Sequence, residues 1–357
     1  MPRHLSGSDV KGKGQTMRFK AESLIDAEAE SFLSDFTEIV PSGLNGAAVG
    51  DAEGIGFPAL LQEMLSVFSD NGGAVGSFFT LMIGIVGLMA LASLFSGKLS
   101  RTAECAVSVI CSAAIFSMIY AVTRQATEAL SGILGFVSAF IPIITGAVAY
   151  GGGVGAAAAG MAGANMTLGI IGAFIIPLMT SCSSMILALG LVSSVGAETG
   201  ALCAKVKSFF IWLVGLCSVL LLSSIALQSA IASAADTAAM RAAKYAATGA
   251  VPIVGSTVSS AMGALVSGAS YIKSTLGTGA LTVILLTSLT PLALLLVYRF
   301  IISLGEGVLE FLGVNTGARM LAAIRAAFDA LCAVFAITVS VLIIETVLLM
   351  KSGVSGV

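Results

Sequence analysis

Apolar runs of roughly 18 residues or more, almost free of charge, recur along this chain from residue 77 to near its C-terminal end. A run of that length can cross the hydrocarbon core of a bilayer as a helix. Strands of a membrane barrel would alternate apolar and polar residues, which these runs do not. The pattern predicts an all-α polytopic membrane protein with about seven transmembrane helices. The predicted spans cover residues 77–96, 105–123, 129–149, 167–195, 209–232, 279–303 and 331–350.

The composition supports this class and divides the chain in two. Charged residues make up 10% of the chain, whereas a soluble domain carries about 25%. Residues 1–76 hold 11 of the 19 acidic residues and 5 of the 17 lysines and arginines, a net charge of −6. We therefore predict an acidic, partly disordered N-terminal segment with short amphipathic helices over residues 1–76. A helical membrane domain follows over residues 77–357.

The stretch 233–277, between two predicted spans, is too long for a turn and too polar for a span. We expect a helix that starts at Asp236, a break from Pro252 to Gly255, and an amphipathic return to Lys273. In that return Val258, Met262, Leu265, Ala269 and Ile272 share one helical face. Such a segment suits the membrane interface or re-entry into the membrane. Its candidate functional residues are Asp236, Arg241, Lys244, Tyr245, Pro252, Gly255 and Lys273.

Two interpretations of these residues stay open. Asp236 precedes an Ala-rich run, where an N-cap of that run is the simplest role. Arg241, Lys244 and Tyr245 form either a solvated or headgroup-facing edge, or the lining of a polar passage or a docking face for an acidic partner.

Candidate helix breaks are Pro142, Gly146, Pro177 and Pro291. Residues 140–146 resemble residues 250–255, and each is followed by an apolar run with a central proline. Such interrupted segments in two halves are typical of repeat-built transporters, so the chain has a possible internal repeat. The alternative is that Pro and Gly are simply common in membrane helices. The run 151–160, rich in Gly and Ala, is either a loop with small-residue helix packing or a re-entrant turn.

Two ionisable residues, Arg299 and Glu345, fall inside predicted spans near their ends. Charges within spans are costly and are functional candidates by default. The alternative is that both side chains reach the interface as anchors.

No motif indicates catalysis. The chain has a single histidine, His4, and no phosphate-binding loop, zinc-ligand spacing or dinucleotide fingerprint. We therefore expect no enzymatic activity, no cofactor, no metal and no nucleic-acid binding. Faces rich in Gly, Ala and Ser favour tight packing with further copies or with partners, so a homo-oligomer or a hetero-complex in the lipid bilayer is expected.

Several short runs resemble the stage III sporulation protein AE family. They are ALQSAIASAAD at 226–236, AKYA at 243–246, VPIVG at 251–255 and YIK at 271–273. Phe140 to Pro142, Pro291 and the pair Tyr298-Arg299 continue the likeness. The resemblance covers roughly residue 77 to the C-terminus. Family members usually begin with a secretory signal, a pattern that the start of this chain does not show.

The resemblance implies a multi-pass protein of endospore-forming Firmicutes, in the mother-cell membrane around the forespore. It implies a role in a channel between the two cells that sustains late forespore gene expression. The implied partners are the AA ATPase and the AB, AC, AD, AF, AG and AH proteins of the same operon. Two alternatives remain: a stand-alone secondary transporter built from broken-helix repeats, and a non-conducting membrane assembly scaffold.

Overall fold

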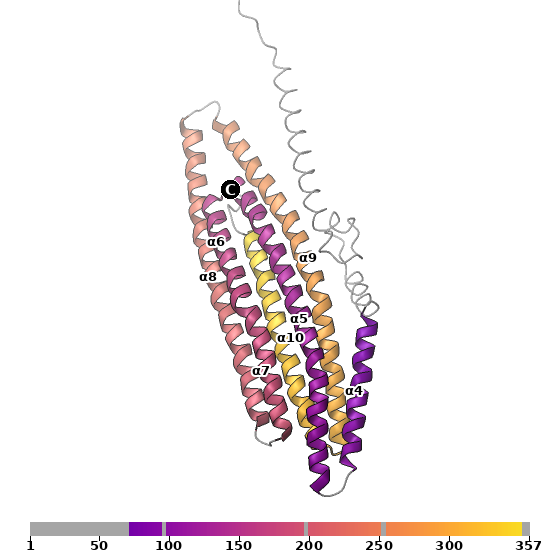
Figure 1. Cartoon of the computed structure of the whole chain (residues 1–357). Coiled ribbons are helices and arrows are strands. Elements are labelled where there is room, and N and C mark those ends of the chain that lie inside the picture. Colours follow the sequence, from indigo (N-terminus) through magenta and orange to yellow (C-terminus); the bar gives the residue numbers. More distant parts are fainter. Residues whose placement is uncertain (1–70, 95–97, 196–198, 251–254, 352–357) are drawn as a thin grey trace, which may run out of the picture. The chain divides into compact units, whose positions relative to one another are not determined.

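The computed structural model describes residues 71–94, 98–195, 199–250 and 255–351, all within one unit of the chain, residues 52–357 (Figure 1). These residues form helices and short turns, with no strand among them, which confirms the predicted all-α class. In chain order the helices are α4 (Gly72–Ser93), α5 (Lys98–Tyr150), α6 (Val154–Ile170), the π-helical η1 (Ile171–Ile175), α7 (Ile176–Val195), α8 (Thr199–Ala250), α9 (Gly255–Phe311) and α10 (Asn315–Lys351).

Six helical segments in the described part of the chain are long and apolar enough to cross a membrane. The difference from about seven arises in α5, which joins the predicted spans 105–123 and 129–149 into one helix of 53 residues. The sequence placed residues 124–128 between two spans, but here Arg124 and Glu128 lie one helical turn apart and form an exposed ion pair, with 2.7 Å between Nε and Oε1. Charges at this spacing support a helix rather than end it.

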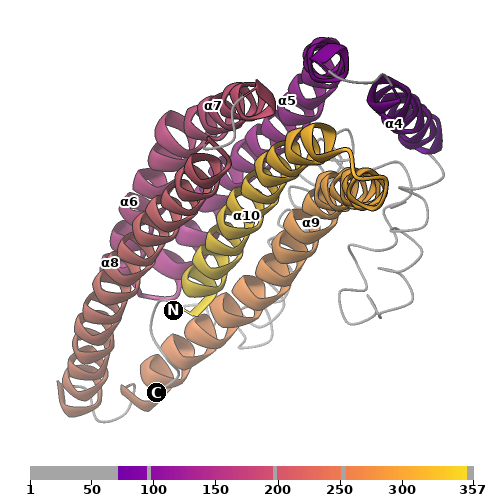
Figure 2. The ribbon, with the colours of Figure 1, turned by 90° about the horizontal axis from the view of Figure 1, so that it is seen from below.

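Helix α10 lies at the centre of the bundle and packs against α5, α7, α8 and α9 (Figures 1 and 2). More than half of its most apolar window is buried, the largest share among the six segments. Helix α4 packs against α5 and α9. A row of buried aromatic rings crosses from α4 to α10: Phe78 meets Tyr298 edge-on with 4.9 Å between ring centroids, and Tyr298 lies 6.4 Å from Phe328.

Two tight turns rest on glycines with positive φ, Gly152 (88°) and Gly313 (75°). After α5, the N–H of Gly153 donates to the carbonyl of Val148 and that of Gly152 to Ala149, both at 3.0 Å. The turn after α9 repeats this pattern around Gly313. This double hydrogen bond ends a helix and needs a residue that tolerates the left-handed conformation. The run 151–160 is therefore a turn followed by the small residues of α6.

The predicted helix breaks at Pro142, Gly146 and Pro291 are absent, since α5 and α9 continue through them. Tertiary packing holds these helices: Ile141 and Ile144 beside Pro142 are fully buried, and Pro291 is itself buried. Pro177 is different. It is the second residue of α7, and α7 directly follows η1, where the helix widens to the π form. Single π-helical turns inside an α-helix are rare, and helices often kink at them.

The structure does not support the internal repeat. Pro142 lies within a continuous helix, whereas Pro252 falls outside the described residues, between the end of α8 and the start of α9. Pro177 follows a π segment, whereas Pro291 sits in the middle of α9. Pro177 and Pro291 therefore occupy unlike surroundings, whereas the pairing of Pro142 with Pro252 stays a prediction.

The stretch 233–277 forms the end of α8 and the start of α9 (Figure 1). Asp236 of α8 and Ala269 of α9 both contact the turn between α5 and α6, at Gly155 and Gly151. Beyond these contacts α8 runs 14 further residues to Ala250, and α9 begins 14 residues before Ala269, about 21 Å of helix in each case. We call this part, residues 237–268, the α8–α9 extension. Its position at or in the membrane stays a prediction.

Candidate functional site

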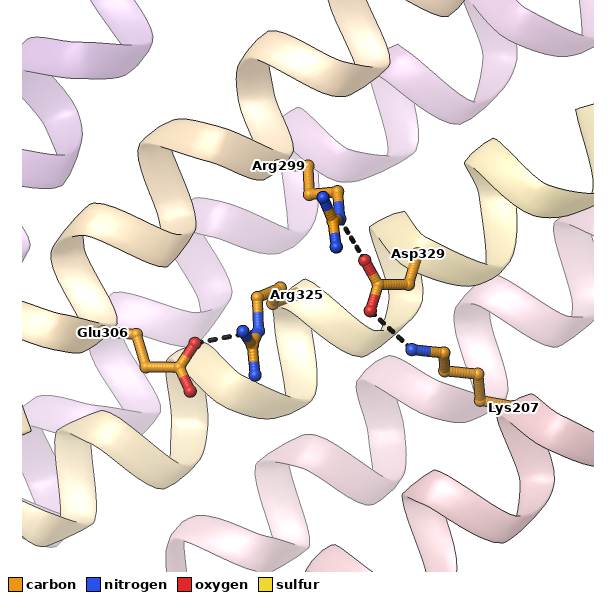
Figure 3. A network of polar contacts seen from close by, with 5 residues as sticks. All are labelled: Lys207, Arg299, Glu306, Arg325 and Asp329. Carbon is orange, nitrogen blue, oxygen red and sulfur yellow. Dashed lines mark hydrogen bonds and ion pairs between the residues drawn. The ribbon is translucent and has the colours of Figure 1, made fainter. Parts of the chain in front are cut away.

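Five charged side chains from three helices gather in one network of polar contacts (Figure 3). They are Lys207 of α8, Arg299 and Glu306 of α9, and Arg325 and Asp329 of α10. We call this group the ionic cluster. It lies in the half of the bundle that contains the turn between α9 and α10, with Asp329 14 residues after the start of α10, about 21 Å along the helix.

Asp329 is the centre of the ionic cluster. One carboxylate oxygen accepts a hydrogen bond from Lys207 Nζ at 2.5 Å, and the other accepts from Arg299 Nε. The Asp329 side chain is 19% exposed, Lys207 27% and Arg299 46%. A second pair joins Arg325 Nε to Glu306 Oε2 at 3.0 Å. One carboxylate therefore links all three helices.

The sequence explains why these charges meet. Arg325 and Asp329 are four residues apart on α10, and Arg299 and Glu306 are seven apart on α9, so each pair shares a helical face. The two helices are antiparallel, which brings Arg299 to Asp329 and Glu306 to Arg325. The aromatic residues just before, Tyr298 and Phe328, point to the fully buried side and pack together.

The ionic cluster has three cations and two carboxylates. Ion pairs in partly buried surroundings are costly to form but more costly to break on one side. Such a group holds α8, α9 and α10 in one register. Because only a few ion pairs join these helices, a competing charge could break the contacts between them.

The sequence had indicated that Asp236 caps the start of its own helix. This prediction is wrong, because Asp236 lies deep within α8. Its carboxylate instead accepts hydrogen bonds from the N–H groups of Gly155 at 3.1 Å and Ala156 at 2.7 Å. Those are free donors in the first turn of α6, whose own N-cap, Gly153, has no side chain. The negative charge also complements the positive end of the α6 dipole. Asp236 thus fastens α8 to α6.

We expect Asp236→Ala to lower the free energy of unfolding by about 1–2 kcal/mol, the usual cost of losing an N-cap. Amide hydrogen exchange at Gly155 and Ala156 should rise in the purified protein. Asp236→Asn should lose less, because its single amide oxygen can still accept one of the two hydrogen bonds. Unchanged protection of these two amides in Asp236→Ala would contradict the assignment.

The other predicted residues of this stretch belong to α8 and α9 or lie outside the described residues. Arg241 is exposed on α8 and, with Ser233, Ala234, Thr237 and Ala238, lines an open cavity of about 560 Å³. Lys273 lies half-buried on α9, and Gly255 is the first residue of α9. Lys244 and Tyr245 belong to α8, with side chains outside those described, and Pro252 lies outside the described residues. A polar passage through them stays a prediction.

The two predicted membrane charges have distinct settings. Arg299 belongs to the ionic cluster. Glu345 is completely buried inside the bundle, so its predicted role as an interface anchor is wrong. Sequence reasoning did not select the other four members of the ionic cluster. Opposite charges one turn apart at Arg325 and Asp329, just before an apolar run, were the available signal.

A bundle of long apolar helices defines a multi-pass helical membrane protein. The sequence profile of stage III sporulation protein AE matches residues 35–353, nearly the whole chain, and the chain belongs to that family. The family gives it a role in stage III of sporulation. Comparisons with curated proteins and with solved structures found no match.

Proposed function

We propose that this protein is a membrane component of the channel or export apparatus that links mother cell and forespore. It would lie in the mother-cell membrane around the forespore and contribute embedded helical surface rather than catalysis. The observation that carries this proposal is the family match over residues 35–353. The other proteins of the stage III A operon, including the AA ATPase and the ring-forming AG and AH proteins, would be its partners.

Two structural features support a role in an assembly. The α8–α9 extension runs about 21 Å past the turn between α5 and α6, where no other described helix accompanies it to its end (Figure 1). Its sequence from residue 237 to 268 contains Arg241 and Lys244 and no acidic residue. A basic projection of this kind suits contact with an acidic protein surface. Nucleotide hydrolysis would then be supplied by a partner.

The proposal is tested by isolating the tagged protein from sporulating cells. Operon partners should co-purify with the wild type. Lys244→Glu should lose them and should lower spore yield by orders of magnitude, while the protein stays in the membrane. Gly255→Trp, at the first residue of α9, should act likewise.

Lys351→Glu is the matched control, since it reverses one exposed charge at the same end of the bundle but on α10. It should retain partners and spores. Normal spore yield in both Lys244→Glu and Gly255→Trp would refute the role of the extension. Uptake of a solute by the purified protein alone in liposomes would favour a stand-alone transporter instead.

A further inference from the structure

One acidic side chain of α10 is buried without an ionic partner. Glu345 is 0% exposed, and its neighbour Thr346 is 1% exposed. Neither carboxyl oxygen of Glu345 has a hydrogen-bond partner of acceptable geometry. An ionised carboxylate in such a place would lose its hydration without replacement, a cost of several kcal/mol.

The surrounding helices supply no countercharge. Residues 154–195, which form α6, η1 and α7, contain no Asp, Glu, Lys, Arg or His. The same is true of α5 after Glu128, of α8 between Lys207 and Asp236, and of α9 between Lys273 and Arg299. On α10 itself the nearest charge is Lys351, six residues away and exposed. Within these described stretches of helix, Glu345 is therefore the one charged residue.

The hydroxyl of Thr167 on α6, itself fully buried, lies close to Glu345. Thr167 Oγ1 already donates its hydrogen to the carbonyl of Gly163 at 3.1 Å. While it keeps that bond, it offers Glu345 lone pairs alone. An ionised carboxylate is also purely an acceptor, so the two oxygens would repel, whereas a protonated carboxyl can donate to Thr167.

Close packing seals this place towards the end of the bundle that bears the α8–α9 extension. A Cβ on Gly160 of α6 would lie 2.8 Å from Leu349, and one on Gly277 of α9 would lie 2.3 Å from Met350. Both contacts fall one turn beyond Glu345 on α10. Exchange of a proton with water on that side therefore requires α6 or α9 to move away from α10.

We propose that Glu345 and Thr167 form a proton-binding site between α10 and α6. Glu345 carries its proton at neutral pH and donates it in a hydrogen bond to Thr167 Oγ1. The proton leaves when the helices part and water reaches the carboxylate. The ligand of the site is the proton, and a sodium ion on an ionised carboxylate is the competing occupant.

The full-length protein in detergent is examined by infrared spectroscopy at neutral pH, in H₂O and D₂O, with and without sodium. The wild type should show the carbonyl band of a neutral carboxylic acid, shifted in D₂O, and Glu345→Gln should lack it. Thr167→Val keeps the side-chain shape and should move this band to the frequency of a carboxyl without a hydrogen bond. These readouts are independent of the sporulation role.

Three results would overturn the proposal. The first is identical spectra of the wild type and Glu345→Gln. The second is a carboxylate band of Glu345 that depends on sodium, which would assign the site to that ion. The third is an unchanged band in Thr167→Val, which keeps Glu345 in place and so does not depend on how well the Gln variant folds.

Discussion

Asp329→Ala should lower the free energy of unfolding by about 2–3 kcal/mol and the melting temperature in detergent by about 5 °C. The substitution leaves Lys207 and Arg299 without the carboxylate that both contact. Removing one side of a buried pair costs about 3–5 kcal/mol, and the lower figure allows for solvent screening of Arg299, which is 46% exposed. Thermal unfolding followed by circular dichroism measures the change.

Two variants make this test specific to the ionic cluster. Glu128→Ala breaks the exposed pair with Arg124 and should cost no more than about 0.5 kcal/mol. Combining Asp329→Leu with Lys207→Met and Arg299→Leu should recover most of the lost stability, because apolar groups can replace a buried ionic group. Equal losses in Asp329→Ala and Glu128→Ala would show that the cluster is not a structural tie.

The second large effect is expected at the turn between α5 and α6. Gly152→Val should destabilise the protein by about 3 kcal/mol or more, for two reasons. Its φ of 88° is unfavourable for a β-branched residue. An added Cβ would also lie 2.1 Å from Met240 Cε. Chemical or thermal unfolding of the purified variant gives the magnitude.

The two causes can be separated. Gly152→Ala combined with Met240→Ala removes the close contact and leaves the backbone strain, so it should recover part of the stability. Gly146→Ala is the control in the preceding helix α5, since no atom of a neighbouring residue lies within 4 Å of its Cβ position. There the loss of a helix-interior glycine should stabilise by up to about 1 kcal/mol. A neutral Gly152→Val would contradict the turn described here.

Apolar periodicity predicted the helical class because runs such as 331–350 have no other way to satisfy their backbone groups in a membrane. The helix breaks predicted at Pro142 and Pro291 were wrong. Packing against neighbouring helices keeps α5 and α9 continuous where the local preference of proline would interrupt them. Local sequence also indicated that Asp236 caps the run that follows it, whereas Asp236 caps α6 instead. A partner 81 residues away, the N–H of Gly155, depends on the register between α8 and α6, which a single sequence does not encode locally.

The candidate site shows the same division. Arg299 and Glu345 were recognisable because each interrupts an apolar run. Asp329 was not, because it lies at the border of a predicted span where a charge is ordinary. Asp329 becomes the centre of the ionic cluster only because α8 and α9 bring Lys207 and Arg299 to it. That arrangement depends on how the helices pack in three dimensions.

The length of α9 has a consequence for the membrane around it. The helix has 57 residues, about 85 Å, whereas the hydrocarbon core of a bilayer is about 30 Å thick. Even at a tilt of about 40°, near the upper limit for membrane helices, α9 would extend about 65 Å along the membrane normal. At least half of it must then stand outside the hydrocarbon core. The protein can thus reach well beyond the lipid surface with the same helices that anchor it, without a separate soluble domain.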